Sequence, residues 1–197
     1  AAGRLATRPG PLMAATDELL ITLTGKGGHA STPHLAIDPI PVAAELVLAL
    51  QTLLTRKVDP FEPVVLTIAR ITAGTTSNVI PETAELEGTL RTVSDRARER
   101  LLAEIERISV HIAAAHDCQA DVVVHRGYPV TVNDAPFVAF TRDVLHQLVG
   151  PERVIDFSQA LTAGEKDVLF GDTKEGTMAI RIAESMRLLG VDKKPGA

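Results

Sequence analysis

The order in which two hydrophobic patterns follow one another along residues 18–125 most constrains the fold of this chain. Strands show apolar residues at every second position or short β-branched runs, whereas amphipathic helices repeat them every three to four residues. The strand pattern occurs in four segments, which are residues 18–24, 64–71, 83–93 and 119–125.

Two helices are predicted between these strands. Asp38 and Pro39 stand where an N-cap and a first-turn proline belong, before an apolar stripe that ends near Arg56. Ser94 and Asp95 cap a second helix, whose core-facing stripe is predicted to comprise Leu101, Ile105, Ile108, Ile112 and Ala115. The charged residues between positions 95 and 107 are interpreted as the solvated face of that helix.

The resulting order is strand–helix–strand–strand–helix–strand, which is the split βαβ, or ferredoxin-like, pattern of the α+β class. It predicts a four-stranded antiparallel sheet with both helices on one face, while the other face is solvated or covered by a partner. Residues 3–15 are predicted to be a connector. Beyond Tyr128, a helix over 135–149, a short strand over 153–157 and a terminal helix over 174–189 have no place in this unit and indicate part of a second domain.

Composition excludes several classes of partner. The net charge is −5 and aromatic residues make up only 3% of the chain, so neither a nucleic-acid surface nor a basic membrane-binding face is expected. No apolar run is long enough to span a membrane, and there is no signal-peptide layout. With a single cysteine, Cys118, an internal disulfide is impossible, which favours a reducing, cytoplasmic location.

Three residues outside the core pattern are candidates for chemistry. His29 follows three glycines in Gly25-Lys26-Gly27-Gly28, which allow a tight turn and a close approach to another surface. Its imidazole could donate to an oxyanion or carry a proton, although an incidental exposed histidine is the alternative. The other two candidates are Asn78, in the loop after residue 74, and Arg91, near the end of a strand. The alternative to a functional role is an ordinary turn residue for Asn78 and an ordinary exposed strand residue for Arg91.

No metal site is predicted in this chain. A hydrolytic site needs three or four converging ligands, and a helix brings histidines together at a spacing of four. His111 and His116 are five residues apart, His29 and His34 flank a proline in a loop, and Cys118 with His116 is a weak pair.

Several short segments, taken in order, resemble the dizinc aminoacylase family of metallopeptidases, which includes hippurate hydrolases and indole-acetyl-amino-acid amidohydrolases. The resemblance covers about residues 4–157. The segments that carry it are Arg8–Ala15, Gly25–Ala30 with Pro33-His34, Asp38–Ile40, Asn78–Pro81, Gly88–Thr92, and Gly127–Pro129 with Val132–Asp134.

The resemblance implies a lid, or dimerisation, domain at residues 16–127 that interrupts a two-zinc catalytic domain. Residues 1–15 would be the connector from that catalytic domain, and residues 128–197 a partial catalytic domain with a divergent C-terminal tail. The family hydrolyses the amide bond of small N-acyl amino acids, using a zinc-bridging water and a glutamate as general base.

The resemblance also implies roles for the three candidates. His29 would stabilise the oxyanion of the tetrahedral intermediate, Asn78 would hold the substrate and Arg91 would bind its carboxylate. The strand between Asn78 and Arg91 is too long for one small substrate to contact both. We therefore expect a homodimer in which His29 and Asn78 serve the partner's site, formed through the edge strand 64–71.

This sequence departs from the family in one respect. The family's zinc ligands have no counterpart here, so the two zinc ions are expected only in the full-length enzyme, and this chain alone is predicted to be inactive. Two alternatives remain open: a catalytically inactive dimerisation or regulatory module, and a metal-independent enzyme that uses His29 as acid and base. The motifs do not indicate which acyl group or amino acid is preferred. The resemblance fades after Phe157, Ala163–Asp167 is at most a loose echo of a late family segment, and Asp172–Ala197 does not align with the family.

Overall fold

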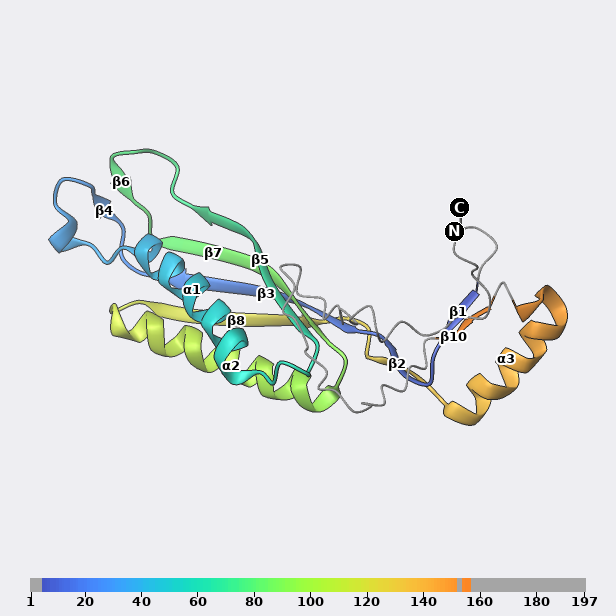
Figure 1. Ribbon diagram of the computed structural model, residues 1–197. Helices are drawn as coiled ribbons and strands as arrows, with labels where there is room; N and C mark the ends of the chain where they lie inside the picture. The colour runs from blue at the N-terminus through green and yellow to red at the C-terminus, as the bar shows by residue number, and fades with distance from the viewer. Residues whose placement is uncertain (1–4, 152–153, 157–197) are drawn as a thin grey trace, which may run out of the picture. The chain divides into compact units, whose positions relative to one another are not determined.

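The computed structural model describes residues 5–151 and 154–156. Its central feature is an antiparallel sheet with the strand order β5–β7–β3–β8 (Figure 1). The strands are β3 (Ala15–Thr24), β5 (Val64–Ala73), β7 (Thr83–Thr92) and β8 (Gln119–Arg126). Sequence order and spatial order together confirm the predicted split βαβ arrangement.

Both long helices cover the same face of this sheet, as predicted (Figure 1). They are α1 (Pro39–Lys57) and α2 (Asp95–Ala115). The predicted caps are confirmed: the Asp38 side chain accepts a hydrogen bond from Ile40 N, and Ser94 accepts one from Ala97 N.

The core between helices and sheet is almost entirely aliphatic. Along β7, Ala84, Leu86, Gly88 and Leu90 are buried, whereas the residues between them are exposed or half-buried. The predicted stripe of α2 is wrong at its end, because Ala115 is exposed and Ala113 is buried in its place. The fully buried aliphatic side chains from these elements include Ile21, Leu23, Val42, Leu46, Leu50, Leu86, Leu90, Leu101 and Ile105.

Three small ladders lie outside the central sheet. β4 (Gly28–His29) pairs with β6 (Val79–Ile80), so the predicted loop 74–81 contains a short strand. β2 (Gly10–Met13) pairs antiparallel with β9 (Thr131–Asn133), and β1 (Leu5–Thr7) pairs in parallel with β10 (Val154–Asp156).

These ladders add short strands to the segment 3–15, for which only a connector was predicted. Proline and glycine there read as loop signals, but both residues are compatible with short strands of this kind.

The remaining elements are helical. η1 (Pro33–Leu35) is a single 3₁₀ turn, and α3 (Ala135–Val149) matches the predicted helix 135–149. The predicted helix 174–189 lies outside the described residues. Among the helices that the structure describes, none combines the length and apolarity needed to cross a bilayer.

A buried ion pair joins the start of β3 to the first turns of α2. Asp17 and Arg98 retain 1% and 6% of their surface exposure, and Arg98 donates from Nε and Nη2 to the two carboxylate oxygens at 2.8 and 2.5 Å. The hydrogen bonds from Arg98 to Asp17 raise the pKa of the arginine above its ordinary value. The interpretation of residues 95–107 as a wholly solvated face is therefore wrong at Arg98.

Breaking this ion pair is expected to lower the free energy of unfolding strongly. Replacing Asp17 by Ala leaves the buried Arg98 without its partner, so we expect a loss of about 3–5 kcal/mol in the free energy of unfolding. Urea unfolding of the full chain, followed by circular dichroism, measures it.

Two further variants act as controls. Glu99→Ala removes the exposed bidentate pair between Glu99 and Arg126 and is expected to cost far less. Asp17→Leu combined with Arg98→Met replaces the charges by apolar groups and should recover most of the loss. Equal losses for Asp17→Ala and Glu99→Ala would contradict the role of burial.

Candidate functional site

The glycine loop is built for close contact rather than for unusual backbone angles. None of its three glycines has a positive φ. A side chain at Gly25 would strike the Ile37 carbonyl oxygen, and a Cβ at Gly28 would lie 2.8 Å from the Cβ of Ala36. The predicted close approach is therefore confirmed, and it allows the loop to fold back on the segment before α1.

This folded loop presents His29 on an exposed two-residue strand. Ser31 N donates to His29 Nδ1 at 3.2 Å, and Ser31 Oγ lies 2.7 Å from the same nitrogen. Because a backbone N–H can only donate, Nδ1 acts as the acceptor and the proton of the neutral ring resides on Nε2. In this tautomer the Nε2–H of the exposed His29 is the hydrogen-bond donor.

The structure brings Asn78 next to His29. Ala30 N donates to Asn78 O at 3.0 Å, and His29 pairs with Val79 in the β4–β6 ladder. The Asn78 side-chain oxygen accepts from Thr76 Oγ1 at 3.1 Å, so the amide NH₂ is left as the donor group. Backbone pairing therefore places the two loops, and with them two donor groups, at the same end of the sheet, and such donors suit a carbonyl oxygen or an oxyanion.

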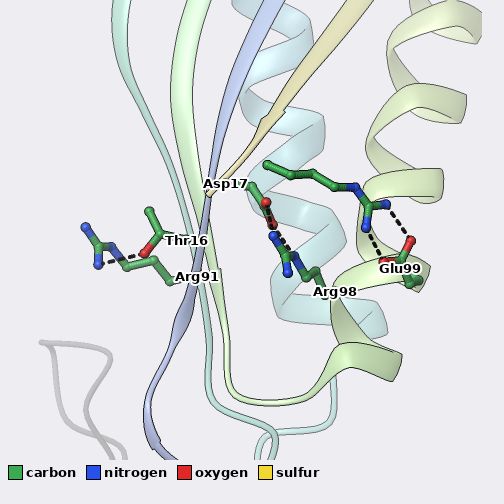
Figure 2. Close-up of polar contacts among 6 residues, drawn as sticks. Thr16, Asp17, Arg91, Arg98 and Glu99 are labelled. Carbon is green, nitrogen blue, oxygen red and sulfur yellow. Dashed lines mark hydrogen bonds and ion pairs between the residues drawn. The ribbon is translucent and has the colours of Figure 1, made fainter. Parts of the chain in front are cut away.

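Arg91 lies on the exposed face of the sheet, at its other end (Figure 2). Its Nη1 donates to Thr16 Oγ1 at 3.3 Å, from the neighbouring strand β3. No carboxylate pairs with Arg91 within the described ranges, whereas Arg70 is paired with Glu87. Among these described residues Arg91 has no acidic partner, and its contact with Thr16 leaves guanidinium donors for a carboxylate.

The register of the sheet separates the two groups of residues. Thr24 pairs with Thr83 at the end that carries the His29 and Asn78 loops, whereas Thr16 pairs with Arg91 near the opposite end. The eight residue steps from Thr83 to Arg91 correspond to about 27 Å. The structure thus brings His29 and Asn78 together and keeps Arg91 apart from both, as the sequence predicted.

The residues that the structure describes do not fit a dinuclear metal centre. Across 5–151 and 154–156, no group of three or more His, Cys, Asp or Glu side chains could hold an ion. His116 Nε2 lies 2.7 Å from Glu45 Oε2, and burial raises the pKa of the Cys118 thiol, which disfavours the thiolate that a metal needs. No step of the chemistry is therefore assigned to a metal on these residues.

Sequence reasoning missed the residues that orient the three candidates. Thr76 and Thr16 each contact a candidate side chain through a hydroxyl, and Ser31 through its hydroxyl and its backbone amide, which leaves no periodic signal. Asp17 lies on the buried face of β3, in step with the alternation of the strand, but a charged residue is not expected at a buried position.

Comparison with known proteins agrees with this architecture. Residues 17–117 match the M20 family described as "Peptidase dimerisation domain". N-acetyl-L-cysteine deacetylase of Bacillus subtilis (strain 168) is 37% identical over 179 residues, which are 91% of this chain and 42% of that protein. N-acetyldiaminopimelate deacetylase of Anoxybacillus flavithermus is 46% identical over 132 residues, covering 67% of this chain and 35% of that protein.

Solved structures show the same fold. The crystal structure of the Bacillus subtilis YXEP protein, described as a dinuclear metal binding peptidase from the M20 family, aligns with a TM-score of 0.62 and 30% identity, covering 80% of this chain and 38% of that one. The chain spans about two fifths of the length of these relatives. Since the family match covers about half of the chain and includes β5, β7, both long helices and most of β3, the chain belongs to the M20 peptidase dimerisation-domain family.

Proposed function

We propose that this chain supplies the dimerisation lid of an amidohydrolase that cleaves the amide bond of N-acyl amino acids. The observation that carries the proposal is the placement of two donor groups at one end of the sheet and, at the other, an arginine that no described carboxylate pairs with. The names of the relatives, which are N-acetyl-amino-acid deacetylases, support the substrate class.

In this proposal each residue matches one part of the substrate. His29 Nε2–H donates to the oxygen that becomes negative when water adds to the amide carbonyl, and the Asn78 amide helps to hold that group. The Arg91 guanidinium binds the free carboxylate of the amino acid through two parallel hydrogen bonds. Two zinc ions, implied by the resemblance to dizinc aminoacylases, would be held by residues other than those described here.

One small substrate cannot bridge about 27 Å, so the proposed site needs two chains. His29 and Asn78 of one protomer would serve the site that contains the Arg91 of its partner. A two-fold dimer creates two such sites at once, because the same exchange occurs in both directions.

The dimer contact is proposed to lie at the exposed edge of β5. β5 is an edge strand of the sheet, and Val65 and Ile71 on it are 46% and 52% exposed. Helix α1 packs beside it, with Gln51 Nε2 donating to Leu66 O at 3.5 Å, and exposes Leu48. An edge that no other described strand pairs with, flanked by apolar side chains, is suited to strand addition by a second copy.

A catalytically inactive dimerisation or regulatory module is the second candidate. It is favoured by the lack of a metal-binding group among the residues described. The two functions are distinguished by the effect of substituting His29 or Arg91 on the turnover of an enzyme that carries this lid.

Exchange of residues between protomers can be tested by complementation. Residues 16–127 are placed into the Bacillus subtilis N-acetyl-L-cysteine deacetylase in place of its matching segment, since the two sequences are 37% identical over 179 residues. We expect His29→Ala and Arg91→Ala each to lower the deacetylation rate about 100-fold. A co-expressed mixture of the two should recover about a quarter of the parent rate, because half of the dimers are mixed and each has one intact site.

The parent chimera and each variant mixed with itself are the controls. If both substitutions impair turnover but the mixture shows no recovery, the two residues act within one protomer and the exchange is wrong. If neither substitution impairs an active chimera, the inactive module is favoured.

The proposed dimer edge makes a separate prediction about the chain itself. We expect the 197-residue chain, of 21.0 kDa, to sediment as a dimer, and Ile71→Asp to dissociate it by placing charge within the added strand. Val123→Asp on the opposite edge strand, β8, is the matched control, because Val123 is also exposed, at 37%. If only Val123→Asp dissociates the dimer, the contact lies on β8, and the proposed contact through β5 is wrong.

A further inference from the structure

Two successive residues of β3 each engage an arginine, on opposite faces of the sheet. Thr16 accepts a hydrogen bond from Arg91 on the exposed face, and Asp17 pairs with Arg98 on the buried face (Figure 2). We propose that Thr16 is a positioning residue, which holds the guanidinium of Arg91 ready for the substrate carboxylate. This inference rests on the proposed function and adds a residue to it.

The backbone of Thr16 is fixed on the side of β8. Thr16 N donates to Tyr128 O at 3.1 Å, and Gly127 N donates to Thr16 O at 3.0 Å. A side chain at position 127 would strike the Thr16 carbonyl oxygen, so glycine is required for this approach. Both the N–H and the C=O of the residue that carries the hydroxyl are therefore hydrogen-bonded.

The buried neighbour adds a second constraint. Asp17 is tied to α2 by two hydrogen bonds from Arg98, so the start of β3 cannot shift without breaking a buried ion pair. Threonine is also stiff, because its branched Cβ restricts rotation about χ1. Together these features hold Thr16 Oγ1 at a defined place beside Arg91.

The neutral chemistry of the contact matters as much as its position. Arg70 on the same sheet is paired with Glu87 at 2.8 Å, and Arg126 is held by both oxygens of Glu99 at 2.6 and 2.7 Å. A carboxylate in the place of Thr16 would hold Arg91 equally well but would neutralise it and occupy its paired donors. A hydroxyl accepts one hydrogen bond and leaves the charge for a ligand.

The kinetic test uses the deacetylase chimera described above. Thr16→Val removes the acceptor with little change of shape, and we expect KM for N-acetyl-L-cysteine to rise about threefold to tenfold while kcat stays within about twofold of the parent value. Thr16→Ser should restore KM. Thr16→Asp, which can pair with Arg91, should raise KM more than Thr16→Val does.

Two comparisons separate positioning from a structural effect. Thr16→Val should add nothing to the KM of the Arg91→Ala chimera, because the residue acts through Arg91. It should also leave the KM for the carboxamide of the substrate unchanged, since that analogue lacks the carboxylate. If Arg91→Ala raises KM but Thr16→Val does not, the positioning role is wrong while the proposed function stands.

A measurement on the 197-residue chain does not depend on activity. The side-chain Nε–H signal of Arg91 in NMR relaxation experiments reports its motion on the picosecond to nanosecond timescale. We expect its order parameter to fall in Thr16→Val and to be retained in Thr16→Ser, with the backbone amides of β7 unchanged. Equal order parameters in the parent and Thr16→Val would overturn the proposal.

Discussion

The ladder between β3 and β7 pairs ten residues of each strand, and the positions of all candidate residues depend on it. One end of the ladder continues into the loops that carry His29 and Asn78. The other end holds Arg91 beside Thr16. Because side chains alternate between the two faces of a sheet, a slip of one residue would bury Arg91 and expose Leu90. The aliphatic core beneath α1 and α2 specifies this register by the surface that it buries.

The buried pair of Asp17 and Arg98 belongs to the same constraint. It is a charged contact in a mainly aliphatic layer, and it fixes α2 to the end of β3 at which Thr16 and Arg91 meet. A rigid sheet of this length keeps its two ends apart. That separation leads to the proposal that a second protomer completes the site, since bending the sheet within one chain would sacrifice its core.

Much of the fold was predictable from the sequence because the core is encoded locally. The stripe from Val42 to Leu53 in α1 and the alternation in β7 each have the period of their element, and Asp38 and Ser94 mark helix starts by their capping chemistry. The short strand predicted over 153–157 is confirmed by β10, whereas the ladders that involve residues 5–13 and the β4–β6 ladder were not predicted. Their strands are two to four residues long, too short to show a period, and they exist only through pairing with distant segments.

The sequence by itself determined the types and order of the four long strands and the two helices that cover them, and the three candidate residues could be named from their chemistry and from family resemblance. Only the tertiary structure decided that Ser31 fixes the tautomer of His29, that Arg98 is buried rather than solvated, and that Arg91 is held by a neutral hydroxyl. The physical reason is the range of the interactions. Periodicity and capping act within a few residues, whereas a hydrogen bond between positions 16 and 91, or an ion pair between 17 and 98, arises only after the sheet has brought those positions together.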